Sequence, residues 1–156
     1  MVTVRHVLRP ARCAVAPLQA RLACEDVLRA SFRLIDQGQA TRAADLYAVD
    51  GTLTLSDATK PVANVTLRGA DIHAAMRQRE AEHRRTLHVL TPLSFRLTAP
   101  DEAESECHLQ VYGLDGDPAE APSPRALSHV QDVLARNPDG AWRISARRIT
   151  ILAGSR

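Results

Sequence analysis

A histidine within a strand-like run is the first residue of this chain whose position could serve chemistry. His88 lies in the run Thr86-Leu87-His88-Val89-Leu90, where it falls on the opposite parity from the apolar strand formers Leu87 and Val89. An imidazole exchanges protons near neutral pH, so a histidine that lines a cavity can act on a ligand as an acid or a base. The strand alone also allows a structural hydrogen-bonding role or a place at the rim of the sheet. His88 is therefore the leading candidate site residue, with both interpretations open.

The elements around His88 follow from hydrophobic periodicity and turn residues. Residues 1–16 are expected to form an N-terminal arm, and residues 17–156 a single domain. Apolar spacing predicts helices over residues 17–37, 40–48 and 70–83, and strands over 52–55, 65–68, 86–98, 103–113, 126–136 and 141–152. A loop is predicted over residues 114–124 and a hairpin turn at Asn137–Gly140. Helices followed by antiparallel strands are typical of an α+β fold, with helices covering one face of a curved sheet.

The composition excludes several classes of function. The 156 residues carry 20 Lys and Arg and 18 Asp and Glu, and only 3% are aromatic, so a nucleic-acid interface is not expected. No apolar run approaches the roughly 20 residues that span a membrane, and the first residues do not resemble a secretory signal, so a cytoplasmic location is expected. Cys13, Cys24 and Cys107 are odd in number and widely spaced, which argues against a disulfide framework and a cysteine metal site. No other metal-ligand spacing is recognised.

Five segments, in order along the chain, resemble the NTF2-like superfamily and within it the SnoaL-like branch, which includes scytalone dehydratase-like proteins. They are the helix end at Leu34–Gln39, the strand entry at Ala44–Leu53, the helix start at Gly69–Ile72, the strand Thr86–Val89 and the closing hairpin Asp139–Ile144. The resemblance covers the chain from about residue 20 to residue 152. It implies a cone-shaped α+β barrel in which three N-terminal helices pack on a curved, mainly antiparallel sheet.

The resemblance also implies where a site lies. Such barrels bind small apolar molecules between the helices and the concave face of the sheet. Scytalone dehydratase-like members place there a polar pair, an Asp at the end of the first helix and a His on the first long strand, and these positions fall on Asp36 and His88. A carboxylate that accepts the imidazole N–H fixes the tautomer and raises the basicity of the ring, which leaves the other nitrogen to move a proton. A capping or turn role at the helix end is the alternative for Asp36.

Six further residues are expected to line the cavity as substrate-binding side chains: Gln131, His129, Cys107, Leu109, Leu55 and Ile35. The resemblance places a polar side chain at Gln131, and His129 shares its strand face. Cys107 is expected to be a small apolar lining residue, because no basic neighbour is evident to lower its pKa. Ile35 and Leu55 stand where scytalone dehydratase-like sites carry tyrosines, so the chain departs from that pattern.

The resemblance favours a cofactor-independent lyase, isomerase or hydratase that acts through the Asp–His pair on a small apolar, polyketide or aromatic substrate. Two other functions stay open. A non-catalytic small-ligand binding protein would explain the missing tyrosines. A structural β-type subunit of an aromatic-ring-hydroxylating dioxygenase would share the fold and a closing strand like Trp142–Ile144 and Arg147–Ile149.

A homo-oligomer, a dimer or larger, is expected because a curved sheet leaves its convex face uncovered. Strand parity is expected to place apolar side chains on that face: Val130, Leu134, Ile149 and Ile151. The neighbours Arg147 and Arg148 have opposite parities. One of them is therefore expected in solvent, and the other in an ion pair or a subunit contact.

Overall fold

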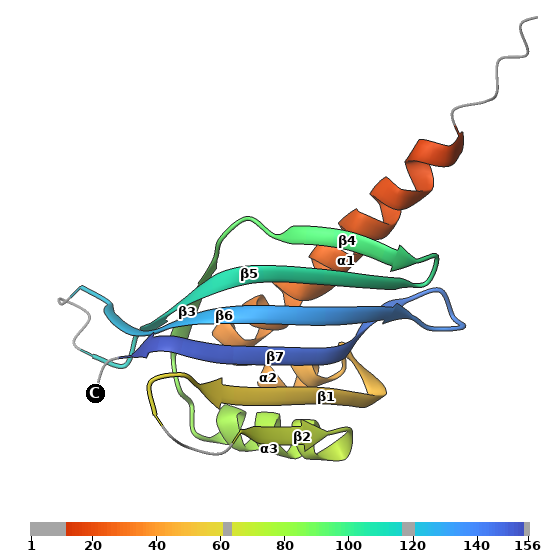
Figure 1. Ribbon diagram of the computed structural model, residues 1–156. Helices are drawn as coiled ribbons and strands as arrows, with labels where there is room; N and C mark the ends of the chain where they lie inside the picture. Colours follow the sequence, from red (N-terminus) through yellow and green to blue (C-terminus); the bar gives the residue numbers. More distant parts are fainter. Residues whose placement is uncertain (1–11, 61–63, 117–120, 155–156) are drawn as a thin grey trace, which may run out of the picture.

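In the part of the chain that the structure describes, three helices cover one face of a seven-stranded sheet, which gives a helical layer and a sheet layer (Figure 1). The computed structural model describes residues 12–60, 64–116 and 121–154. Residues 1–11 of the predicted arm and residues 117–120 of the predicted loop lie outside the described residues, whereas residues 12–16 belong to the first helix.

Helix α1 (Arg12–Asp36) anchors the helical layer and ends at a candidate site residue. Cys24, Leu28 and Phe32 recur every four residues and are buried, because this spacing puts them on one face of the helix. The helix starts before the predicted first-turn Pro17, which lies inside it. Gly38 has a φ of 71°, a left-handed conformation that suits glycine, and it ends the helix as predicted. Asp36 is thereby held in the last turn of α1.

Helices α2 (Ala40–Ala44) and α3 (Ala70–Ala81) complete the helical layer. The helix predicted over residues 40–48 is shorter than expected, because Tyr47 already pairs with Ile144 in the sheet. Sheet pairing therefore overrides helical propensity at the end of α2. None of the helices in the described part of the chain is long and apolar enough to cross a membrane.

The sheet consists of β1 (Tyr47–Asp57), β2 (Val65–Arg68), β3 (Thr86–Leu90), β4 (Ser94–Ala99), β5 (Glu102–Gly113), β6 (Ser123–Arg136) and β7 (Trp142–Gly154). The strand order is β2-β1-β7-β6-β5-β3, and β4 also pairs with β5. β1 and β7 are parallel, and the other pairs are antiparallel. The sheet is therefore mixed and mostly antiparallel, which confirms the predicted α+β class.

Strands β3 and β4 correct the prediction of one strand over residues 86–98. Both pair with β5, β3 along its C-terminal half and β4 along its N-terminal half. The break falls at Thr91–Leu93, where Pro92 cannot donate a backbone hydrogen bond to a ladder. His88 therefore lies on a short strand of five residues, in the same half of β5 as Leu109 and Val111.

The two faces of β6 are reversed relative to the prediction. Val130 and Leu134 are fully buried on the face toward the helices, not on the uncovered face. Val130 is paired with Cys107 and Leu134 with Ala103, both buried, because residues opposite each other in a ladder point to the same side. His129 and Gln131 consequently point to the uncovered face. The prediction that they line the interior is wrong.

Candidate functional site

Asp36 and His88 meet at the end of α1, where the helix passes over β3. The distance from His88 Nδ1 to Asp36 Oδ1 is 2.5 Å, and the side chains are 9% and 17% exposed. The His88 backbone N–H also donates to Asp36 Oδ2, at 2.9 Å. Both carboxylate oxygens are thus bound by the same residue, which fixes the carboxylate and the ring relative to each other. The structure brings together the two residues that the resemblance singled out.

A hydrogen-bonded chain continues from Asp36 to the surface. The Thr86 hydroxyl donates to Asp36 Oδ1 at 3.4 Å, and Arg79 Nη2 donates to the Thr86 oxygen at 2.9 Å. Arg79 comes from α3 and Thr86 from the first residue of β3. The Asp36 carboxylate therefore connects three elements, α1, α3 and β3. A helix-capping role does not account for these contacts, because they run to side chains and to a strand amide.

The environment keeps the His88 ring neutral. Burial lowers the pKa of His88 below its usual 6.5, and the Asp36 carboxylate opposes this shift without reversing it. A neutral ring whose Nδ1–H donates to Asp36 has its lone pair on Nε2. His88 can then accept a proton at Nε2, and Asp36 can stabilise the imidazolium that forms.

The pKa of His88 can be tested directly by NMR. We expect its imidazole to titrate below pH 6.5, because burial disfavours the charged ring. Asp36→Asn should lower the midpoint further, since it removes the nearby negative charge. Between the folded-state pKa and 6.5 the unfolded chain binds more protons, so the stability that His88 contributes is present above pH 6.5 and is lost as the pH falls. A midpoint above 6.5 would contradict the neutral ring.

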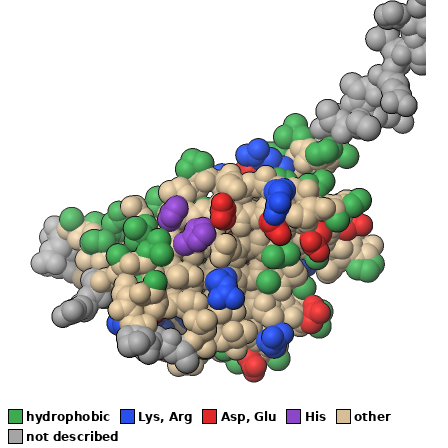
Figure 2. All heavy atoms as spheres, in the orientation of Figure 1, with side chains coloured by type: hydrophobic (Ala, Val, Ile, Leu, Met, Phe, Trp, Pro, Cys, Tyr) green, Lys and Arg blue, Asp and Glu red, His purple; other side chains and the backbone are tan. Residues whose placement is uncertain are grey.

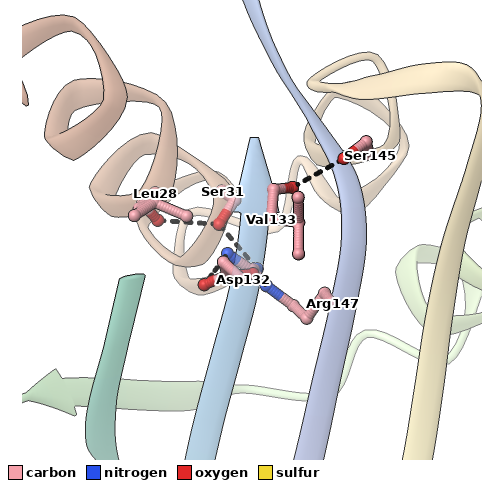
Figure 3. A network of polar contacts seen from close by, with 6 residues as sticks. All are labelled: Leu28, Ser31, Asp132, Val133, Ser145 and Arg147. Atoms are coloured by element: carbon pink, nitrogen blue, oxygen red, sulfur yellow. Dashed lines mark hydrogen bonds and ion pairs between the residues drawn. The ribbon is translucent and has the colours of Figure 1, made fainter. Parts of the chain in front are cut away.

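A buried ion pair, whose acidic partner the sequence did not identify, lies deeper between α1 and the sheet (Figure 3). Arg147 on β7 binds Asp132 on β6 through two guanidinium nitrogens, with Nε to Oδ1 at 2.6 Å and Nη2 to Oδ2 at 3.3 Å. Both side chains are 2% exposed. Arg147 Nη1 also donates to the Ser31 hydroxyl at 2.8 Å, and that hydroxyl donates to the Leu28 carbonyl at 2.7 Å. The pair thus fastens β6 and β7 to α1.

The prediction that the two neighbouring arginines divide between the faces is confirmed. Arg147 is buried in the ion pair and Arg148 is exposed. One sequence signal could have identified Asp132 as the partner of Arg147. Asp132 is the charged member of the otherwise small or apolar set Ser128, Val130 and Leu134, and a carboxylate on a buried face needs a counter-charge.

Phe32 connects the buried ion pair to the Asp36–His88 pair. The Arg147 guanidinium lies over the Phe32 ring at 4.5 Å, and the His88 ring lies 5.3 Å from it, centroid to centroid. A cation over an aromatic face is attracted by the ring quadrupole. The positive charge of Arg147 also helps to lower the pKa of His88. The two polar groups therefore share one aromatic spacer inside an apolar core.

The six other predicted lining residues lie in four different environments. Cys107 and Leu109 are buried on the face toward α1, and burial raises the pKa of the Cys107 thiol to about 11, which disfavours the thiolate. Ile35 lines a surface crevice beside Asp36. Leu55 is exposed near the end of β1. His129 and Gln131 are on the uncovered face.

The uncovered face of the sheet carries a separate polar surface. Figure 2 views this face and shows histidine side chains beside an acidic one over β5 and β6. The His108 and His129 rings lie 5.3 Å apart, and His129 Nε2 is 3.4 Å from Glu106 Oε2. Within the described ranges, no group of three or more His, Cys, Asp or Glu residues is arranged to hold a metal ion.

Comparisons with known proteins agree with this architecture. The SnoaL-like domain matches residues 16–148. An NTF2-like protein with a cystatin-like fold from Novosphingobium aromaticivorans is 22% identical, with a TM-score of 0.70 and coverage of 95% of this chain and 94% of that one. A second protein from that organism, provisionally described as a scytalone dehydratase, is 14% identical, with a TM-score of 0.72 and coverage of 90% and 89%.

A third solved structure, from Catenulispora acidiphila in complex with S-DNPA, is 16% identical, with a TM-score of 0.67 and coverage of 86% of this chain and 94% of that one. No curated protein matches the chain. At these identities the structural likeness concerns the fold alone, and the predicted NTF2-like fold is confirmed.

Proposed function

Because the chain belongs to the SnoaL-like domain family, we propose that it is a cofactor-independent lyase, isomerase or hydratase acting on a small apolar or aromatic substrate, such as a polyketide. The observation that carries this proposal is the 2.5 Å contact between Asp36 and His88, with the ring free at Nε2 and mostly withdrawn from water. The likeness to a protein provisionally described as a scytalone dehydratase is consistent with it.

The proposed chemistry is a proton transfer through His88. In a dehydration, Nε2 takes a proton from the carbon next to a carbonyl, and the C–H electron pair forms the new double bond. The bond to the hydroxyl on the adjacent carbon breaks, and the proton held by His88 leaves with that hydroxyl as water. In an isomerisation the same proton returns to a different carbon. Asp36 stabilises the imidazolium between the two steps.

The alternatives use the same fold without turnover. A small-ligand binding protein would keep the Asp–His pair as polar anchors, and this role would explain why Ile35 and Leu55 stand at the positions of the missing tyrosines. A β-type subunit of a ring-hydroxylating dioxygenase would act only beside a larger catalytic subunit. Both are proposals of second rank, because the binding protein gives the Asp36–His88 pair no proton to transfer and the β-type subunit gives the pair no role.

Turnover by the isolated chain separates these functions. We expect the purified protein, without added cofactor, to dehydrate or isomerise members of a panel of aromatic β-hydroxy ketones, followed by the change in ultraviolet absorbance. Addition of a chelator should leave the rate unchanged. Saturable binding of panel members without turnover would support the binding protein. Copurification with a large Rieske-type subunit would support the dioxygenase role instead.

The partner that we propose for the uncovered face is a second copy of the chain. Val89 on β3 and Leu127 on β6 both pair with Gln110 of β5 and are exposed, and Leu87 is exposed on the same side of β3. This row of apolar side chains lies next to the polar residues of the face, a mixture typical of subunit interfaces. We expect a homodimer mass by light scattering at micromolar concentration, and Leu127→Glu should shift it toward the monomer. A monomeric mass for the unaltered chain would contradict the proposal.

A further inference from the structure

A crevice on the helical side of the protein carries an unusual set of positive charges. It lies where the end of α1 and the start of α2 meet the end of α3 and the turn into β3, and its volume is about 460 Å³. Its lining includes Asp36 and Gly38 and four basic residues, which are Arg79 and the three consecutive residues His83, Arg84 and Arg85. We call this site the arginine crevice.

The acidic side chains around the crevice already have partners. The Asp36 carboxylate binds His88, and Glu80 accepts the Thr41 backbone N–H at 2.8 Å. Glu82 is 2.6 Å from Arg84. Asp115 accepts the Arg85 backbone N–H at 2.8 Å, a contact that does not use the guanidinium.

The arginine side chains retain unused donors. A guanidinium has five N–H groups, and the contacts of Arg79 and Arg84 among the described residues, to Thr86 and Glu82, use few of them. Burial lowers the pKa of Arg79, and so does the positive charge of Arg84, whereas the carboxylates of Asp36, Glu82 and Asp115 act in the opposite direction. The Arg85 guanidinium forms no ion pair with any residue that the structure describes.

Neutralising the negative ends of two helices is the other role that these arginines could have. Cations near a helix C-terminus are favourable, and both α1 and α3 end here. The carbonyls of their last turns, however, already accept backbone N–H groups. Gly38 donates to Ile35 at 3.0 Å and His83 donates to Glu80 at 3.1 Å. Among the described residues, the side-chain contacts of Arg79 and Arg84 run to Thr86 and Glu82, not to these carbonyls.

We propose that the arginine crevice binds an oxyanion, the phosphate or carboxylate group of a small molecule. Planar guanidinium groups match the geometry of both anions, because each can present two parallel N–H donors. A bound oxyanion would accept hydrogen bonds from the N–H groups that Arg79 and Arg84 leave unused, and it would occupy the free donors of Arg85. This inference does not depend on the proposed reaction, since binding can be measured without turnover.

The crevice is connected to the candidate active site by the chain Arg79–Thr86–Asp36–His88. The bonds along it run from Arg79 Nη2 to the Thr86 oxygen, from Thr86 to Asp36 and from Asp36 to His88 Nδ1. An anion that binds Arg79 would change the hydrogen bond that Arg79 Nη2 donates to the Thr86 hydroxyl oxygen. Anion binding in the arginine crevice should therefore change the environment of the His88 ring through the Asp36 carboxylate.

Binding is best tested on the full chain by calorimetry with inorganic phosphate and, in a separate arm, with acetate, each against sodium chloride at equal ionic strength. We expect saturable binding of at least one of the two, which identifies the preferred group. Arg84→Gln combined with Arg85→Gln should weaken that binding by about tenfold or more, since hydrogen bonds to charged groups are lost. The matched control is Arg68→Gln with Arg77→Gln, which removes two exposed arginines outside the crevice and should leave the affinity unchanged.

Three outcomes would overturn the site. The first is that neither anion binds more than chloride does. The second is that both double variants weaken binding equally, which means general attraction by net charge. The third is that the crevice variant is less stable without any anion while its anion affinity is unchanged, which means that the arginines only neutralise helix ends.

The connection between the arginine crevice and His88 can be tested separately by NMR. Phosphate or acetate should shift the NMR resonances of the His88 ring in the unaltered chain, and Thr86→Val should abolish this shift while anion binding persists. A shift of equal size in Thr86→Val would overturn the proposed route through Thr86.

Discussion

Replacing His88 with alanine is expected to lower turnover of the substrate by about 10²- to 10⁴-fold, the usual worth of a general acid or base. The proton acceptor of the pair is His88 Nε2, because Nδ1 is hydrogen-bonded to Asp36. The measurement is kcat and kcat/KM of the purified variant, with circular dichroism to confirm the fold. A loss of only a few-fold would reduce His88 to a packing residue on Phe32.

Two variants serve as comparisons for His88→Ala. Asp36→Asn should cost less, since the amide oxygen can still accept the Nδ1–H but cannot stabilise the imidazolium. His73→Ala removes a partly exposed histidine on α3, outside the candidate site, and should leave the rate unchanged. An Asp36→Asn loss larger than that of His88→Ala would show that the carboxylate, rather than the ring, handles the proton.

Replacing Arg147 with methionine is expected to lower the free energy of unfolding by roughly 3–5 kcal/mol, because it leaves the Asp132 carboxylate buried without its counter-charge. Both side chains are 2% exposed, so water cannot take the place of the guanidinium without a structural change. The Ser31 hydroxyl loses a donor in the same variant. Urea denaturation, monitored by circular dichroism, measures the difference in unfolding free energy between the variant and the unaltered chain.

A double variant separates the charge from the packing. Arg147→Met combined with Asp132→Leu removes both charges and should recover much of the loss, since a buried ion pair is often no more stable than a well-packed apolar pair. Arg148→Met changes the exposed neighbour and should move the unfolding free energy by about 0.5 kcal/mol or less. A double variant less stable than Arg147→Met would mean that Asp132 is stabilised by other groups.

The identity of the candidate pair could be predicted from the sequence, and so could the order of elements apart from the break that divides residues 86–98 into β3 and β4. Strand β2 has the predicted bounds Val65–Arg68, and the hairpin turn forms at Asn137–Gly140, where Gly140 has a φ of 84°. These are local properties, set by side-chain alternation and turn residues within a few positions. Asp36 and His88 were found because the motifs of a resemblance fall on them, 52 residues apart.

Which face of a strand is buried was decided only by tertiary pairing. The alternation along β6 separates Ser128, Val130, Asp132 and Leu134 from His129 and Gln131, but alternation alone does not say which set faces the helices. The ladder with β5 decides this, because Val130 is opposite the inward Cys107. The polar set that looked suited to a ligand site therefore lies outside, and the set containing a carboxylate lies inside.

The sequence by itself determined the fold class, most of the element order and the Asp36–His88 pair. These depend on short-range patterns and on the motifs through which the chain resembles its family. Tertiary structure alone decided that Asp132 and Arg147 meet across β6 and β7 under α1, and that three arginines gather beside Asp36. The physical reason is that a charge is tolerated in a core only where a distant segment supplies its partner. That partner can be identified only when strand register and helix packing are known.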